Sequence, residues 1–261
     1  MKYVLDSHTH TVASGHAYST LHEMAKEAAE KGLKLLGITE HSMTMPGTCH
    51  EYYFQNMRML PRELYGIQVM HGSEVNIIDY DGKMDMGDSL LKKMDVVIAS
   101  LHIPCIRPGT LEENTRALLG AMNHPYVNII GHPDDSRYPV DYEILVKAAK
   151  DKGVLLELNN TSLHPKSSRK DAAPNDRILL RLCKEYEVPI ILGSDAHTQE
   201  DIGNHRYLDA LLEETAFPEN LIVNRSVDEY KKYINRYKDM MPGSKGHDFH
   251  ACMKNHDIGT R

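Results

Sequence analysis

The chain has 261 residues, of which 41% are hydrophobic, and its formal net charge at pH 7 is -7. This is enough for one large α/β domain with a hydrophobic core. No apolar run approaches the roughly 18 residues of a membrane-spanning helix, and the acidic balance argues against broad binding to nucleic acid or to anionic membranes. The N-terminus shows no signal region and the four cysteines are scattered, so we expect a cytoplasmic protein without a disulfide framework.

Predicted strands and helices alternate along the chain. Short buried strands are expected over residues 3–5, 35–39, 67–71, 95–100, 127–130, 154–158 and 189–192. Helices are expected over 19–31, 51–64, 89–93, 111–122, 142–152, 174–187 (with Pro174 as first residue), 206–214 and 227–237, with a turn at 79–82 and an extra strand at 221–223. Such alternation predicts a parallel sheet closed into a barrel. We place this single domain at residues 1–238 and expect a disordered polar tail, 239–261.

The 16 histidines are many for this length, and two of them follow the first strand as His8-Thr9-His10. Residues i and i+2 of a strand point to the same side, so these imidazoles are a natural pair of metal ligands. Alone, the pair is a weak signal, because two surface or hydrogen-bonded histidines would look the same. Asp195 and His197 repeat this spacing after the last strand.

Potential metal ligands follow most of the predicted strands at their carboxyl ends. They number seven histidines and two carboxylates: His8, His10, His16, His41, Glu74, His102, His132, Asp195 and His197. Active sites of α/β barrels lie at this end, so we expect the nine side chains to converge. A set of this size, with one bridging carboxylate, suits three divalent ions with open positions; imidazole and carboxylate ligands favour zinc, with manganese or iron also compatible.

The chain resembles the PHP domain family, named for polymerase and histidinol phosphatase. The matching pieces are Asp6-Ser7-His8-Thr9-His10, His16, Thr39-Glu40-His41, Gly72-Ser73-Glu74, Ser100-Leu101-His102, Gly131-His132-Pro133, Leu156-Glu157-Leu158-Asn159-Asn160 and Gly193-Ser194-Asp195-Ala196-His197. The resemblance is strongest to stand-alone bacterial members with a trinuclear zinc site. It implies a distorted (β/α)7 barrel and phosphoester hydrolysis by a metal-bound hydroxide.

The resemblance also implies how the ligands divide among the ions. His8, His10, Glu74 and Asp195 would bind one ion, Glu74, His102 and His132 a second, and His16, His41 and His197 a third. Three such ions with two carboxylates and one hydroxide leave a charge of about +3, which would attract the dianion of a small phosphomonoester. Asp195 and His197 are candidates for the proton donor to the leaving group. Arg107, Lys166, Arg169 and Arg206 are candidate phosphate-binding residues by location alone.

Three alternatives stay open. Histidinol phosphatase activity is the specific variant of the same chemistry. A barrel amidohydrolase also begins with His-x-His, but it usually has eight strands and a bridging residue at the fourth. A non-catalytic PHP module would tolerate lost ligands, whereas this set is complete.

The tail could hold a separate zinc site of His247, His250, Cys252 and His256. The sequence leaves open whether the chain forms a homo-oligomer.

Overall fold

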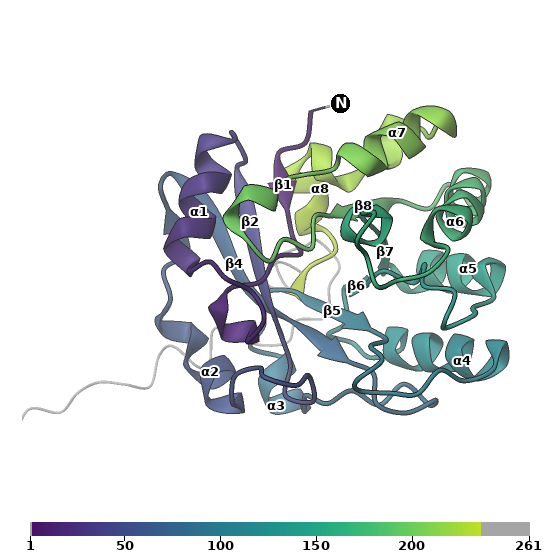
Figure 1. The fold of residues 1–261 in the computed structure, drawn as a ribbon, viewed down its shortest axis with the longest axis horizontal. Coiled ribbons are helices and arrows are strands. Elements are labelled where there is room, and N and C mark those ends of the chain that lie inside the picture. Colours follow the sequence, from purple (N-terminus) through teal and green to yellow (C-terminus); the bar gives the residue numbers. More distant parts are fainter. Residues whose placement is uncertain (1, 236–261) are drawn as a thin grey trace, which may run out of the picture.

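The computed structural model describes residues 2–235, and its centre is a curved, mostly parallel β-sheet (Figure 1). The strands in spatial order are β1 (Leu5–Asp6), β2 (Leu35–His41), β4 (Ile67–Asn76), β5 (Val97–Ser100), β6 (Ile129–Ile130), β7 (Leu155–Asn159) and β8 (Ile190–Gly193). Every neighbouring pair along this path is parallel, and the short β3 (Glu63–Leu64) pairs antiparallel with β4.

The first and last strands come together and nearly close the sheet into a barrel. Just beyond their carboxyl ends, Thr9 and Ala196 form an isolated parallel bridge. Nearer the amino ends, the side chain of Asn224 fills the gap. Its Nδ2 donates to the carbonyls of Leu5 (3.2 Å) and Leu192 (2.8 Å), and its Oδ1 accepts from the Leu192 amide (2.7 Å). Closure therefore depends on one buried amide side chain as well as on backbone pairing, which confirms the expected distorted barrel of seven parallel strands.

Hydrophobic side chains fill one half of the barrel interior. The inward-facing residues near the strand beginnings form one buried cluster that includes Leu35, Met70, Ile98, Leu155 and Ile191. The same cluster contains Tyr230 of α8 (Val227–Lys231), so this short helix closes that end of the barrel. Burial of apolar surface against α8 leaves only the carboxyl ends of the strands available for a polar site.

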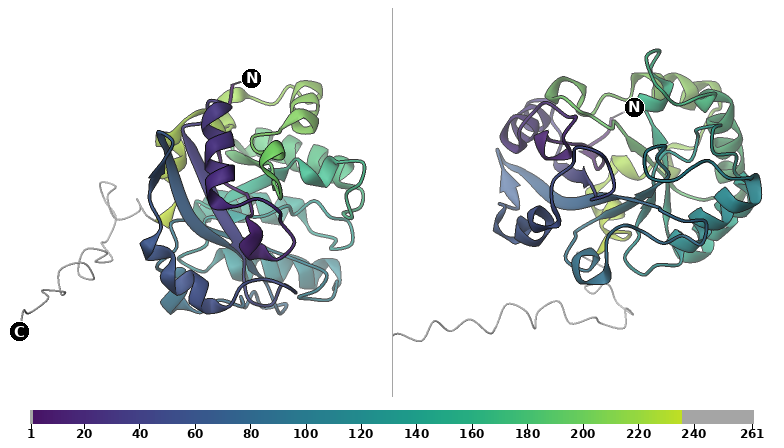
Figure 2. Two further views of the ribbon diagram at one scale, coloured as in Figure 1. Left: turned by 60° about the vertical axis from the view of Figure 1, so that its left-hand side comes forward. Right: turned by 60° about the horizontal axis from the view of Figure 1, so that its bottom comes forward.

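The remaining helices cover the outside of the sheet (Figures 1 and 2). They are α1 (Leu21–Glu30), α2 (Glu51–Asn56), α3 (Asp88–Leu91), α4 (Leu111–Met122), α5 (Tyr142–Lys152), α6 (Ala172–Tyr186) and α7 (Arg206–Glu214). Helices α1 and α4 begin with capping boxes, Thr20 with Glu23 and Thr110 with Glu113. Their apolar faces pack on the outward-facing strand residues, which form the main core.

Most expected elements are present, many of them with shifted bounds; the strand expected over 67–71, for example, continues to Asn76. Four further differences stand out. The helix expected over 51–64 stops early, because Pro61 cannot continue it, and residues 63–64 form β3 instead. Helix α6 begins at Ala172, so Pro174 is its third residue; this costs nothing, since the first four amides of a helix have no partner inside it. In place of the strand expected over 221–223, Leu221 and Val223 belong to two 3-10 turns, and Ile222 between them forms a single parallel bridge with Ile190. Helix α8 ends at Lys231.

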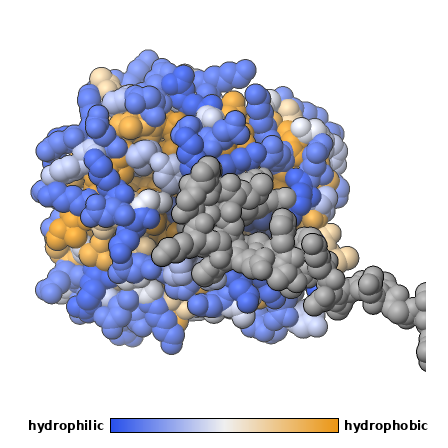
Figure 3. Space-filling view, turned by 180° about the vertical axis from the view of Figure 1, so that it is seen from behind, coloured by the Kyte–Doolittle hydropathy of each residue, from blue (hydrophilic) through white to orange (hydrophobic). Residues whose placement is uncertain are grey.

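The surface shown in Figure 3 is mostly hydrophilic, with smaller hydrophobic areas between. Within residues 2–235, no helix combines the length and the hydrophobicity needed to cross a membrane. Cys49, Cys105 and Cys183 are free thiols. The predicted tail, with its candidate zinc ligands, lies outside the described residues.

Candidate active site

Glu74, at the carboxyl end of β4, is the centre of a buried cluster of imidazoles. Its side chain is almost fully buried, and five histidine nitrogens lie within 3.5 Å of its two oxygens: those of His8, His10, His41, His102 and His132. The histidines come from the ends of β1, β2, β5 and β6, so the parallel sheet alone accounts for their meeting. One carboxylate flanked by imidazoles on both oxygens has the geometry of a bridging ligand.

Asp195 forms the opposite wall of the cluster. Its Oδ1 lies 3.3 Å from His10 Nε2 and 3.7 Å from His8 Nε2. Its Oδ2 accepts a hydrogen bond from Arg169 Nη2 at 3.0 Å. The backbone of Asp195 has a φ of 55°, a left-handed conformation that costs energy for a residue other than glycine, and His132 also has a positive φ of 28°. Backbone strain of this kind concentrates where a side chain must be aimed at a site.

His16 and His197 lie at the mouth of the cluster. Their ring centroids are 5.0 Å apart, and each ring lies close to that of His41, at 4.8 Å for His16 and 6.0 Å for His197. The His197 side chain is 27% exposed, whereas His8 and His10 are fully buried. The nine predicted residues therefore form one continuous group that extends from the barrel interior to solvent.

Three of the imidazoles have their second nitrogen committed to an oxygen atom that is not among the clustered ligand atoms. Nδ1 of His8 lies 2.6 Å from Glu157 Oε1, and Nδ1 of His102 lies 2.7 Å from Asn76 Oδ1. Nδ1 of His197 lies 2.9 Å from the carbonyl oxygen of Asp195. These oxygens can only accept, so Nδ1 carries a proton in each ring and Nε2 is the nitrogen left to face the cluster.

His10 is held in the same tautomer by a relay. Its Nδ1 lies 3.1 Å from Ser14 Oγ, and that hydroxyl donates its only proton to Glu40 Oε2 at 2.6 Å. Ser14 Oγ must therefore accept from His10, which leaves His10 Nε2 unprotonated. Such outer partners fix the tautomer and the orientation of metal-binding histidines.

The side chain of Glu157 lies beneath the cluster, and its contact with His8 depends on a glycine in the neighbouring strand. Besides His8, it accepts from the backbone amide of His132 through Oε2 at 2.9 Å. A Cβ on Gly193, in the neighbouring strand β8, would lie 1.9 Å from Glu157 Oε1 and 3.2 Å from His8 Cβ. Only glycine at this position leaves room for the contact between Glu157 and His8.

The electrostatics of the cluster favour ionised carboxylates and divide the imidazoles. Burial lowers the pKa of His8, but Glu157, Glu74 and Asp195 outweigh it and raise that pKa well above the usual value. Burial opposes ionisation of Glu74, but His102, His8 and His41 outweigh it and hold its pKa well below the usual range. The pKa of Asp195 is lowered in the same way, with His8, His10 and Arg169 overcoming burial. Burial, followed by the neighbouring His41, lowers the pKa of His10 strongly and that of His16 to about 4. Imidazoles with low pKa values keep lone pairs available near neutral pH.

Three overlapping groups of side chains have ligand atoms within 4.8 Å of one another: His8, His10 and Glu74; His41, Glu74 and His102; and His10, His41 and His197. Glu74 belongs to two of these groups, as the resemblance implies for a bridging residue. The groups otherwise divide the histidines differently from the expected sets. In the group of His41 and His197, His10 takes the place where His16 was expected. His16 and His132 belong to none of the three groups.

The sequence missed several residues that support the cluster. Glu157, Asn76, Ser14 and Glu40 hold its histidines, yet none of them is a predicted site residue. The available signal for Glu157 was a charged residue inside an otherwise apolar strand. Of the candidate phosphate-binding residues, Arg169 alone has a contact to the cluster among those the structure gives; Arg107, Lys166 and Arg206 are exposed.

A barrel with a buried carboxylate surrounded by histidines at the carboxyl ends of its strands has the arrangement of a metal-binding barrel protein. The family model described as "PHP domain" matches residues 6–161. A probable phosphatase of Clostridium novyi (strain NT) is 50% identical over 244 residues, covering 92% of this chain and 99% of the relative. A probable phosphatase of Acetivibrio thermocellus is 44% identical over 239 residues, covering 92% and 98%.

Among solved structures, the histidinol phosphate phosphatase of Lactococcus lactis, in complex with zinc, L-histidinol and phosphate, superposes with a TM-score of 0.53. It is 20% identical and the match covers 83% of this chain and 95% of that one, a likeness in fold. The chain belongs to the PHP domain family. It is a phosphatase, a hydrolase that acts on phosphoric ester bonds.

Proposed function

We propose that the chain is a metal-dependent phosphomonoesterase that uses three divalent ions, most simply zinc, held by the nine clustered side chains. The observation that carries this proposal is the set of buried ligand atoms without a hydrogen bond: Nε2 of His8, His10 and His102, Nδ1 of His41 and Oε2 of Glu74. Lone pairs buried together without donors are costly, and divalent cations would satisfy them at once. This donor set therefore fits the ions that the resemblance implies.

The residues divide into three groups of ligands in this proposal. His8, His10, Glu74 and Asp195 would hold one ion, and Glu74, His102 and His132 a second. His16, His41 and His197 would hold the third, at the mouth where substrate enters. When bound, the ions would activate water and neutralise the phosphoryl oxygens. The zinc and phosphate in the structure of the Lactococcus lactis enzyme support the choice of zinc and of a phosphate ester.

The protein's own side chains would position and protonate the substrate. Arg169 lies beside Asp195 and fixes that carboxylate through its guanidinium, so the ligand oxygen Oδ1 keeps its orientation. Asp195 and His197 are our candidates for passing a proton to the departing alcohol. His197 is the better placed of the two, because its side chain is 27% exposed whereas the pKa of Asp195 is held well below its usual range. We assign this activity to a single domain, residues 1–238, of a cytoplasmic enzyme acting on a small molecule.

The test combines a metal assay with a phosphatase screen on protein purified without chelator. We expect about three transition ions per chain and hydrolysis of at least one small phosphomonoester, with inorganic phosphate as an inhibitor. The screen should include histidinol phosphate, since the structural neighbour binds L-histidinol and phosphate. Protein that holds its metal but cleaves no phosphoester would instead favour a non-catalytic metal-binding module.

A further inference from the structure

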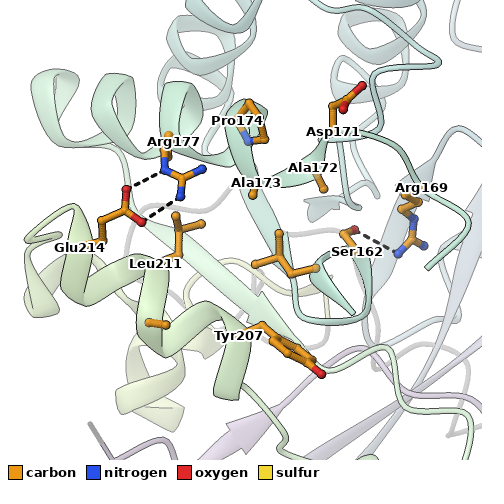
Figure 4. Close-up of a pocket in the computed structure, with 12 residues that line it drawn as sticks. Ser162, Arg169, Asp171, Ala172, Ala173, Pro174, Arg177, Tyr207, Leu211 and Glu214 are labelled. Carbon is orange, nitrogen blue, oxygen red and sulfur yellow. Dashed lines mark hydrogen bonds and ion pairs between the residues drawn. The ribbon is translucent and has the colours of Figure 1, made fainter. Parts of the chain in front are cut away.

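A cavity of about 370 Å³ opens beside the histidine cluster, between the segment after β7, the start of α6 and helix α7 (Figure 4). Arg169 and Ser162 form its inner end, and they are hydrogen-bonded to each other at 3.1 Å. The same guanidinium contacts Asp195 of the cluster. The cavity is therefore separated from the candidate metal ligands by a single side chain.

We propose that this cavity binds the alcohol portion of the phosphomonoester, and that it selects alcohols with an apolar or ring-containing body. This inference rests on the proposed phosphomonoesterase activity and extends it to the substrate class. With the phosphoryl group on the ions, a substrate group that extends along the Arg169 side chain would reach the cavity, which begins at that residue. Its volume lies at the lower end of the range for small-molecule sites, about 300–1,000 Å³.

The walls of the cavity explain the preference for apolar alcohols. Between its two ends they consist of aliphatic side chains, including Leu163, Pro174 and Leu211, and the ring of Tyr207 (Figure 4). A sugar would bring several hydroxyl groups against these walls, and buried hydroxyls without partners are unfavourable. An aliphatic chain or a ring would instead remove apolar surface from water on both sides.

The outer end of the cavity is polar but internally neutralised. Arg177 Nε and Nη2 donate to the two carboxylate oxygens of Glu214 at 2.7 and 2.9 Å. Asp171 lies on the Arg169 side of the cavity (Figure 4), and it accepts from Ser136 Oγ at 2.9 Å. Because the Arg177 and Glu214 charges compensate each other, this end does not call for a second phosphate or a strongly charged group on the substrate. It would accept one polar or zwitterionic end group.

A second cavity on the described part of the chain is too small to compete. It is lined by His132 and Leu101, among others, and measures about 10 Å³. A cavity of this size holds one water molecule at most. Of these two cavities, the larger is therefore the one with room for an organic group.

The experiment uses non-hydrolysable inhibitors, so that leaving-group reactivity does not enter. Inhibition constants of inorganic phosphate, methylphosphonate and benzylphosphonate are measured on the metal-loaded full-length enzyme. We expect benzylphosphonate to bind about tenfold more tightly than methylphosphonate, because its ring would be buried in the cavity. The non-hydrolysable phosphonate analogue of glucose 6-phosphate should bind no more tightly than methylphosphonate.

Filling the cavity should remove this difference. Ala210→Trp on α7, and independently Ala173→Leu on α6, introduce bulk at residues that line the cavity and lie outside the ligand cluster. In both variants we expect benzylphosphonate to bind like methylphosphonate, with inhibition by inorganic phosphate unchanged. Glu213→Trp, at an exposed position of α7 that does not line the cavity, is the matched control and should behave like the parent.

Two results would overturn the inference. One is an equal preference for benzylphosphonate in the parent, Ala210→Trp and Ala173→Leu proteins; the other is its absence from the parent while methylphosphonate still inhibits. If neither phosphonate nor inorganic phosphate inhibits an active parent enzyme, the proposed phosphomonoesterase function fails as well. Inhibition by phosphate thus separates an error about the cavity from an error about the reaction.

Discussion

Glu157→Gln tests whether the buried carboxylate beneath the cluster prepares His8 to bind metal. Glu157 Oε1 accepts from His8 Nδ1 at 2.6 Å, and Oε2 accepts from the His132 amide at 2.9 Å. Glutamine replaces one of these acceptors with an NH2 group. A donor must then face either the His8 ring proton or the His132 amide, at a site where Glu157 is almost fully buried.

The size of the effect follows from that conflict. A buried donor without an acceptor costs about 1–3 kcal/mol, and each 1.4 kcal/mol is a factor of about ten in affinity. His8 could escape by moving its proton to Nε2, but that atom would then no longer bind metal. We therefore expect metal affinity to fall about 10- to 100-fold, the usual range for outer partners of metal ligands.

The assay is competition with a chelator of known affinity, on metal-loaded protein at one pH, with kcat/KM measured in parallel. Asp176→Asn is the matched control, because Asp176 is also a fully buried carboxylate but has no hydrogen bond to a ligand of the cluster. Thermal unfolding of both metal-free variants checks that the fold survives. Parental metal affinity and activity in Glu157→Gln would refute the role given to Glu157.

Four further predictions follow from the same structure. Incubation with EDTA should abolish activity, and readdition of zinc should restore it together with about three ions per chain; activity that survives complete metal removal would contradict the proposal. Glu74→Gln should lose metal and activity together, because both oxygens of Glu74 face imidazoles; an active variant with unchanged metal content would exclude bridging. 4-Nitrophenyl phosphate should be cleaved with a kcat/KM roughly 10- to 100-fold above that of bis(4-nitrophenyl) phosphate, since a diester lacks one charge and one contact; equal rates would point to nuclease-like chemistry. Burial, then Asp134 and Glu157, raises the pKa of Asp176 well above its usual value, so the metal-free protein should lose stability as pH rises above the unfolded-state pKa of about 3.9 until the folded-state pKa is passed; urea unfolding at pH 5 and 8 should show a smaller loss in Asp176→Asn.

Local sequence patterns were sufficient to predict most elements of the barrel. The helices over 111–122, 142–152 and 206–214 have the predicted bounds, because each combines an apolar stripe with a clear start or stop signal, such as Thr110 or Gly153. Predictions were wrong where tertiary contacts compete with local preference. Residues 221–223 are apolar enough for a strand, yet the neighbouring Asn224 side chain takes the hydrogen bonds of Leu5 and Leu192 that a full strand would make.

The sequence by itself determined which residues meet at the candidate site. Parallel strands bring their carboxyl ends to one edge, so residues as distant as His8 and Asp195 had to converge once the strands were recognised. It could not determine which histidine nitrogen faces the centre. That depends on Glu157, Ser14 and Asn76, whose contacts are set by the three-dimensional packing of strands and loops.

The cavity that we assign to the substrate alcohol was likewise beyond the sequence. Its walls come from three segments, around residues 162–163, 169–177 and 207–214, and no periodicity in the chain relates them. Arg169 was one of four candidate arginines and lysines with equal claims, and its hydrogen bond to Asp195 separates it from the others. The types and order of the ligands are local properties of the chain, whereas their tautomers and the neighbouring space follow from the packing of distant segments.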